Sequence, residues 1–143
     1  MATINPYLNF DGNAEAAFNF YKSVFGGEFI TFQLLKNAPD GDKLSVEEQN
    51  RVMHVSLPIS EGFVLMGSDI VPSMGHKLIK GNNSYVSLNT KTKEETERLF
   101  NALSEGGTIQ MPLAMTFWGS YFGMFADKFG TQWMVSQQHD KQG

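Results

Sequence analysis

The chain has 143 residues, of which 41% are hydrophobic and 18% charged, the composition of one folded domain rather than of a disordered segment. Its 11 basic and 15 acidic side chains leave a net charge of −4, which argues against a nucleic-acid partner. The lack of cysteine excludes disulfides, thiolate metal sites and a cysteine nucleophile. No run of 18 apolar residues and no signal-like start are present, so we expect a cytoplasmic protein without a membrane span.

The first half of the sequence predicts a strand, a helix and three further strands. Residues 7–10 predict a short strand, and Asn13 in the following turn is expected to cap a helix. Apolar residues at helical spacing continue from position 14 until Gly26-Gly27, where the helix should end. Three more strands are predicted, separated by a long polar stretch that would form a loop or a mobile lid: residues 29–35, 52–59 and 63–67, with the polar stretch at 36–50.

The second half repeats this order. A strand at 84–88 precedes Thr92 and Glu95, whose spacing matches a capping box, and the helix that follows should end at Gly106-Gly107. Strands are predicted at 108–117, 121–126 and 131–136. The sequence therefore predicts an α+β fold of two βαβββ modules, about residues 4–70 and 82–138. We expect them to form a single domain over 1–143, because either half alone would bury too small a core.

Aromatic side chains are dense near the end of the chain. The sequence has 12 Phe, 2 Trp and 4 Tyr. Seven of them fall between positions 117 and 133: Phe117, Trp118, Tyr121, Phe122, Phe125, Phe129 and Trp133. Aromatic side chains bury about 150–250 Å² each, so this density predicts a thick core, a ligand cavity or a subunit interface.

The paired βαβββ modules resemble the vicinal oxygen chelate superfamily, whose fold is also called the glyoxalase/bleomycin resistance/dihydroxybiphenyl dioxygenase fold. Local motifs are similar to its PhnB-like branch, often labelled 3-demethylubiquinone-9 3-methyltransferase-like. They span nearly the whole chain: residues 6–10, 20–27, 53–55, 111–113, 117–119 and 127–133. The resemblance implies a half-open barrel of eight strands around a cavity, and a homodimer. Members of the superfamily are isomerases, lyases, dioxygenases or drug-sequestering proteins.

The resemblance also implies where a divalent metal would be held, namely by His, Glu or Gln on the first and last strand of each module. In this chain those positions hold Asn5 or Tyr7, then Met66, and in the second module Ser84 or Tyr85, then Met134. Two thioethers cannot replace two carboxylates for a hard or borderline cation. We therefore predict no metal of the usual kind and no other cofactor.

His54 is the main candidate for catalysis, as an acid, a base or a ligand-orienting donor. Strand alternation places Val52, His54 and Ser56 on one face, and Met53, Val55, Leu57 and Ile59 on a core face. Tyr7 and Asn9 share a face of the first strand and are candidate ligand-binding residues. Each of these side chains has the alternative of a purely structural hydrogen bond. The remaining histidines, His76 and His139, are expected to be solvated.

Further candidate ligand-binding residues are Met66, Trp118, Phe122, Gln132 and Met134. Trp118, Phe122 and Phe125 could form an apolar slot, the methionines would give an adaptable wall, and Gln132, Met134 and Ser136 share one strand face. The alternatives are core packing, an exposed edge or a dimer contact. Asp127 and Asp69 are expected to anchor turns through backbone N–H groups.

These residues favour a protein that binds a small, partly apolar molecule, and they leave open whether it is an enzyme. The alternative is a metal-dependent isomerase, lyase or dioxygenase with atypical ligands. A demethylubiquinone-type methyltransferase ranks lower, because no glycine-rich strand-to-helix turn offers a site for S-adenosylmethionine.

Overall fold

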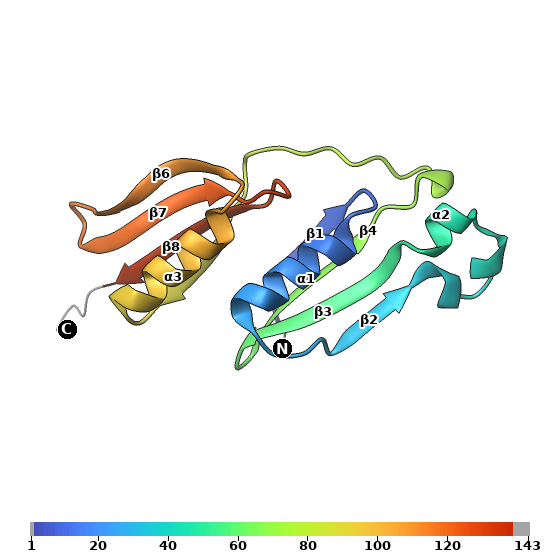
Figure 1. Cartoon of the computed structure of the whole chain (residues 1–143), viewed down its shortest axis with the longest axis horizontal. Coiled ribbons are helices and arrows are strands. Elements are labelled where there is room, and N and C mark those ends of the chain that lie inside the picture. Colours follow the sequence, from blue (N-terminus) through green and yellow to red (C-terminus); the bar gives the residue numbers. More distant parts are fainter. Residues whose placement is uncertain (1, 139–143) are drawn as a thin grey trace. The chain divides into compact units, whose positions relative to one another are not determined.

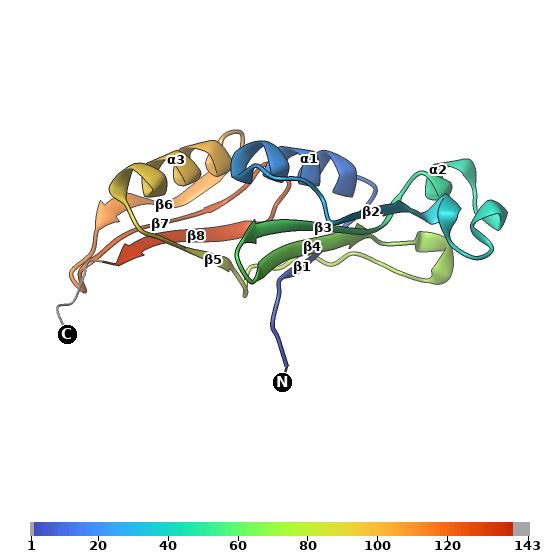
Figure 2. The same ribbon diagram turned by 90° about the horizontal axis from the view of Figure 1, so that it is seen from below.

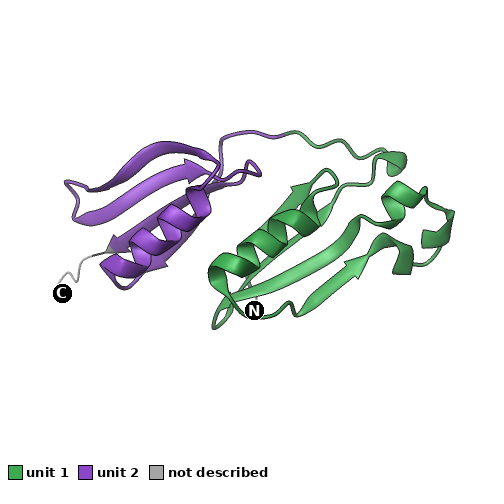
Figure 3. Cartoon of the chain, viewed as in Figure 1, with its two compact units in different colours: residues 1–79 green, residues 80–143 purple. Residues whose placement is uncertain are grey.

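The chain forms two compact units, Met1–Ile79 and Lys80–Gly143 (Figure 3). The computed structural model describes residues 2–138. Each unit contains one four-stranded mixed sheet and one long helix, so the predicted α+β class is confirmed.

The sheet of the first unit has the strand order β1-β4-β3-β2. The strands are β1 (Tyr7–Phe10), β2 (Thr31–Leu34), β3 (Val52–Ser60) and β4 (Phe63–Asp69). β1 runs parallel to β4, whereas β3 is antiparallel to both β2 and β4. Helix α1 (Ala14–Phe25) lies along one face of this sheet (Figures 1 and 2). β2 is shorter than the predicted strand 29–35.

The polar stretch after β2 contains three short helical segments, η1 (Leu35–Asn37), η2 (Gly41–Lys43) and α2 (Val46–Gln49). Pro72–Met74 forms a further single turn, η3, after β4. The region predicted as a loop or lid is therefore folded into local turns.

The second unit repeats the first. Its sheet has the order β5-β8-β7-β6, with β5 parallel to β8 and the remaining pairs antiparallel. The strands are β5 (Val86–Thr90), β6 (Thr108–Met115), β7 (Ser120–Ala126) and β8 (Gln132–Gln138). Helix α3 (Lys93–Ser104) covers one face of this sheet (Figure 2). β5 begins two residues later than the predicted strand 84–88.

Both helices pack apolar side chains onto their sheets. In the first unit Phe18 of α1 makes edge contacts with Phe10 and with Tyr21. Gly67 of β4 lies beneath the Phe18 ring, where a Cβ would approach that ring to 2.7 Å, so only glycine fits. In the second unit Phe100 of α3 packs on Phe125 with ring centroids 5.1 Å apart. The helix-side faces therefore hold the two cores.

The prediction for β3 was wrong at Val52 and Met53. Val52 is fully buried, whereas Met53 is 37% exposed. The cause is a β-bulge: Gln33 pairs with His54 but Leu34 pairs with Val52, so Met53 is an extra residue on β3. The bulge turns Val52 towards the core and leaves His54 and Ser56 on the other face.

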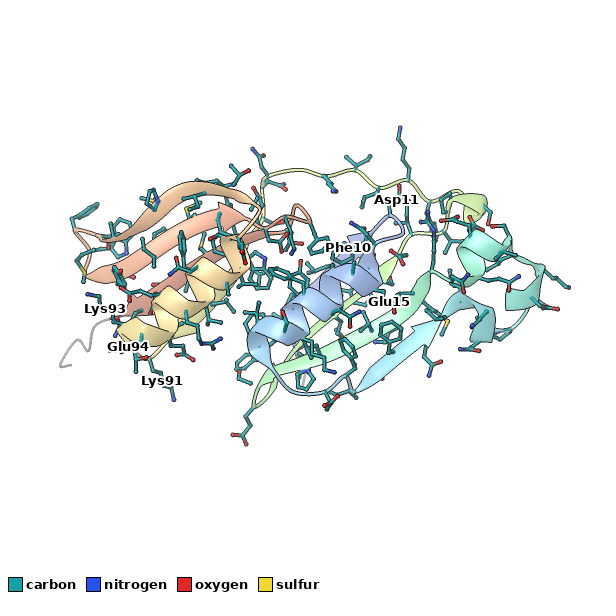
Figure 4. All side chains as sticks on the ribbon, in the orientation of Figure 1. Phe10, Asp11, Glu15, Lys91, Lys93 and Glu94 are labelled. Atoms are coloured by element: carbon teal, nitrogen blue, oxygen red, sulfur yellow. The ribbon has the colours of Figure 1, made fainter. Side chains whose placement is uncertain are left out.

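The two helices begin in different ways; Figure 4 labels Asp11 and Glu15 near the start of α1, and Lys91 and Lys93 near the start of α3. Thr92 Oγ1 accepts the Glu95 N–H at 3.1 Å, as the capping box predicts, whereas Glu95 Oε1 reaches one residue beyond the cap and accepts the Lys91 N–H at 3.1 Å. Asn13, by contrast, makes no side-chain capping bond. Asp69 at the end of β4 takes that role, because its Oδ1 accepts the N–H groups of Gly12 and Ala14 at 2.8 and 3.0 Å. Asn13 is therefore the N-cap residue by position, as predicted, but the capping carboxylate comes from Asp69.

Candidate functional site

The face of the first sheet opposite α1 carries four of the predicted ligand-binding residues. Tyr7 and Asn9 alternate with Leu8 and with the buried Phe10 of the helix side, as strand geometry requires. Met66 pairs with Tyr7 across the parallel strands and with Ser56 across the antiparallel ones. His54 shares this face with Ser56. The structure thus brings Tyr7, Asn9, His54 and Met66 onto one surface of one unit.

Tyr7 and His54 are in direct contact, although 47 residues separate them. Tyr7 Oη lies 3.2 Å from His54 Nδ1. The two rings are stacked, with centroids 5.7 Å apart and planes inclined by 21°. Tyr7 is 44% exposed, so this phenol–imidazole pair is accessible within its unit.

A hollow of about 350 Å³ lies in the same unit, beside the ends of β1 and β4. Its lining consists of Asn9, Ser68, Asp69, Ile70, His76 and Lys77. Asn9 is the residue that belongs both to this lining and to the predicted ligand-binding set. Ser68 pairs with Asn9 across the parallel strands.

His76 is exposed, as predicted, but it is also anchored. Its Nδ1 accepts the backbone N–H of Val71 at 3.1 Å. This bond connects the histidine to the chain directly after β4. The sequence did not single out Ser68 or Lys77, and it assigned His76 no role. His139 lies outside the described residues.

Asp69 and Arg51 hold the backbone around the hollow in place. Asp69 is buried, and its Oδ2 accepts the Val52 N–H at 2.9 Å, which confirms its predicted anchoring role. Arg51 donates to the Ile70 carbonyl at 2.9 Å and pairs with Asp11 and Glu47. Burial lowers the pKa of Arg51, but its hydrogen bonds to Asp11 and Glu47 outweigh that effect and raise the pKa.

The second sheet carries the other candidates on the face opposite α3. Met134 pairs with Ser87 on one side and with Met124 on the other, and Phe122 pairs with Ser136. Gln132 donates to the Ser84 carbonyl at 2.8 Å and accepts from Gln110 at 3.2 Å. Trp118, in the turn before β7, meets the Phe122 ring edge-on at 6.0 Å and is 48% exposed.

The predicted slot of Trp118, Phe122 and Phe125 is not formed. Phe125 is fully buried against Phe100 on the helix side of the sheet. Because Phe122 and Phe125 are three residues apart on one strand, alternation places them on opposite faces. Asp127, in contrast, has its predicted role, since its Oδ1 accepts the Phe129 and Thr131 N–H groups at 2.9 and 3.0 Å.

The two units share a repeated register on these faces. Asn9 pairs with Ser68 in the first unit, and Asn89 pairs with Ser136 in the second. Met66 and Met134 each lie two residues before that serine, and their partners on the parallel strand are Tyr7 and Ser87. The counterpart of Tyr7 is therefore Ser87, and the same offset makes Tyr85, which precedes β5, the counterpart of Asn5.

Carboxylates are missing from the places where a metal would be expected. Within residues 2–138 no group of three or more His, Asp or Glu side chains could hold a metal ion. Divalent cations of the hard kind need such oxygen donors in number. Tyr7 and His54 offer two adjacent donor atoms, which fall short of a usual coordination shell.

The fold defines the class of protein. A glyoxalase/bleomycin resistance protein/dioxygenase family enzyme from Burkholderia phytofirmans superposes with a TM-score of 0.61, at 17% identity over 93% of this chain and 97% of its own. The chain thus has the glyoxalase/bleomycin resistance fold. Among the described residues, no helix is both long and apolar enough to span a membrane. The homodimer and the cytoplasmic location stay predictions.

Within this class, the chain belongs to the 3-demethylubiquinone-9 3-methyltransferase family, whose model matches residues 2–136. It is similar to protein PA1353 from Pseudomonas aeruginosa, with a TM-score of 0.85 and 39% identity over 98% of this chain and 100% of that one. The PhnB protein from Bacillus cereus has a TM-score of 0.76 at 26% identity, over 95% and 99%. Protein YjdN from Escherichia coli is 30% identical, over 93% of each chain. The PhnB-like resemblance is therefore confirmed.

Proposed function

We propose that this protein binds a small, partly apolar molecule on the sheet face opposite α1, with Tyr7 and His54 as its polar anchor. The observation that carries the proposal is the Tyr7–His54 pair, with Oη and Nδ1 3.2 Å apart. Small-molecule sites typically combine apolar surface with a few placed polar groups. Here a phenol and an imidazole lie beside the Met66 thioether and the Asn9 amide.

The second sheet offers a separate, more apolar surface for a molecule of the same kind. The residues of β7 and β8 on the face opposite α3 carry no formal charge: Ser120, Phe122, Met124, Ala126, Gln132, Met134 and Ser136. Flexible, polarizable methionines and an exposed tryptophan suit a planar or aromatic ligand. Each unit therefore offers a surface of a different character.

The strand-to-helix turns support methyl transfer, the activity in the family description, less than they support binding alone. Sites for S-adenosylmethionine in doubly wound folds use a glycine-rich turn after a parallel strand. The turn between β1 and α1 has one glycine, Gly12, and the turn between β5 and α3 has none. We therefore place binding ahead of methyl transfer and ahead of a metal-dependent isomerase, lyase or dioxygenase.

The test is a thermal-shift screen of one-ring and two-ring aromatic compounds, followed by calorimetric titration of the best compound. We expect Tyr7→Phe and His54→Gln each to weaken its binding about fivefold, the effect of one lost hydrogen bond. Tyr121→Phe is the matched control, because it removes a phenol that donates to Glu97 of α3, on the helix side of the second sheet. Its affinity should equal that of the wild type.

The same protein preparation tests the alternatives. A stoichiometric transition metal found by plasma mass spectrometry would favour the metal-dependent enzyme, and calorimetric binding of S-adenosylmethionine would favour the methyltransferase. Wild-type affinity in both Tyr7→Phe and His54→Gln would refute the proposed anchor. A screen without any stabilising compound would refute the binding proposal as a whole.

A further inference from the structure

We propose that the hollow beside β1 and β4 binds an oxyanion group, a carboxylate or a phosphate, of the small molecule that this protein binds. That this protein binds a small molecule at all rests on the proposed function. The oxyanion site itself rests on the hollow of about 350 Å³ lined by Asn9, Ser68, Asp69, Ile70, His76 and Lys77. Nothing in the Tyr7–His54 pair requires the ligand to carry a charge.

Three side chains of this lining have hydrogen-bonding capacity that the fold does not use. The Asn9 amide, the Ser68 hydroxyl and the Lys77 ammonium make no side-chain hydrogen bond or ion pair with any residue between 2 and 138. Together they supply an amide donor, a hydroxyl donor and a cation. Charged oxygen acceptors bind such donors more strongly than neutral acceptors do.

His76 adds an imidazole N–H donor to the lining. A backbone N–H can only donate, so His76 Nδ1, which accepts the Val71 N–H at 3.1 Å, carries no proton while that bond is present. A neutral imidazole holds its proton on the other nitrogen, and Nε2 is therefore a donor. The histidine presents an N–H group and no acceptor at its free end, which suits an oxygen ligand.

Asp69 is the group that would oppose an anion, and its charge is already satisfied. Three backbone N–H groups, those of Gly12, Ala14 and Val52, donate to its two oxygens at 2.8–3.0 Å. Two of these donors lie at the start of α1, where the helix dipole also favours a negative charge. The Asp69 carboxylate is thus committed to the backbone, and Lys77 is left as the cation of the lining without a counter-ion among the described residues.

Arg51 does not take the place of Lys77. Its guanidinium contacts the wall through the Ile70 carbonyl, but Asp11 and Glu47 already neutralise it at 2.8 and 3.0 Å. One uncompensated cation together with neutral donors matches one oxyanion group. The ligand class that follows is a small, partly apolar acid rather than a neutral aromatic compound.

The test follows backbone amide signals of the full chain labelled with nitrogen-15 while benzoate, phenyl phosphate or benzamide is added. Benzamide has the same ring without the charge. We expect both anions to shift the Ile70, Val71 and Lys77 signals and benzamide to leave them unchanged. Lys77→Gln should raise the anion Kd about fivefold, the effect of one exposed charge pair, and reduce its dependence on salt.

Lys36→Gln is the matched control, because it removes one exposed lysine charge from the same unit outside the hollow. Equal weakening in Lys36→Gln and Lys77→Gln, or shifts by benzamide as large as those by benzoate, would overturn the oxyanion site. Tighter binding of phenyl phosphate identifies a phosphate ligand, and tighter binding of benzoate a carboxylate.

Failure of this inference is separable from failure of the proposed function. A neutral compound that binds through Tyr7 and His54, with no preference for anions, would overturn the oxyanion site alone. Benzoate held by Lys77 with no effect of Tyr7→Phe would support the oxyanion site and overturn the proposed anchor.

Discussion

A single carboxylate, that of Asp69, joins three parts of the first unit. It accepts N–H groups from the β1–α1 turn, from the first residue of α1 and from the start of β3. The Ala14 and Val52 donors would otherwise be buried without partners, which is costly in free energy. Asp69 therefore fixes both the start of the helix and one wall of the hollow.

We expect Asp69→Asn to destabilise the protein by about 2–3 kcal/mol. The asparagine oxygen can replace one carboxylate oxygen, but its NH₂ group would face an N–H donor. Denaturant-induced unfolding measures the loss, with the exposed Asp42→Asn as control. Identical unfolding midpoints for the two variants would contradict this role of Asp69.

At the scale of elements, Glu48 fastens α2 to η3. Its carboxylate accepts the Ser73 hydroxyl at 2.6 Å and the Ser73 N–H at 3.0 Å. The Ser73 hydroxyl lowers the pKa of Glu48 most, the Ser73 N–H and Arg51 lower it further, and burial opposes them. A local contact between two short turns is thereby made sensitive to acid.

Because the pKa of Glu48 is lower in the folded chain than its ordinary value of 4.5, this contact stabilises the fold above that value. The stabilisation is lost as the pH falls through the lower, folded-state pKa. Glu48→Gln should therefore be less stable than the wild type at about pH 6, and the difference should shrink below about pH 4. Thermal unfolding across this range is the measurement, with Glu61→Gln, in the exposed β3–β4 turn, as control; a constant difference would contradict the linkage.

Local signals predicted most of these elements, and long-range pairing explains the errors. The Thr92–Glu95 capping box and the glycine stops lie within a few residues of the structure that they specify. The bulge at Met53 depends on how β2 meets β3, and the role of Asp69 depends on donors 55 and 57 residues earlier in the chain. No pattern in the neighbouring sequence indicates the bulge or the capping role of Asp69.

At the scale of the whole molecule, the duplication was predictable because both halves repeat the same order of patterns. Strand alternation also predicted that Tyr7 and Asn9 share a face. Their neighbours could not be predicted, because the contact of Tyr7 with His54 requires the strand order β1-β4-β3. Lys77 was missed because it lies in an irregular segment, where no periodicity indicates the direction of a side chain.

The two tryptophans of the chain are both in the second unit, in opposite surroundings. Trp133 is 1% exposed, and its indole N–H donates to Asp127 at 2.9 Å, whereas Trp118 is 48% exposed. Tryptophan fluorescence therefore originates entirely from residues 80–143, from two tryptophans with different access for a dissolved quencher. We expect iodide to quench the emission of Trp118 in the wild type and to leave the emission of the Trp118→Phe variant almost unchanged. Strong quenching of that variant would contradict the burial of Trp133. Ligand binding that affects only Tyr7 and His54 must be followed by tyrosine fluorescence or by backbone amide signals.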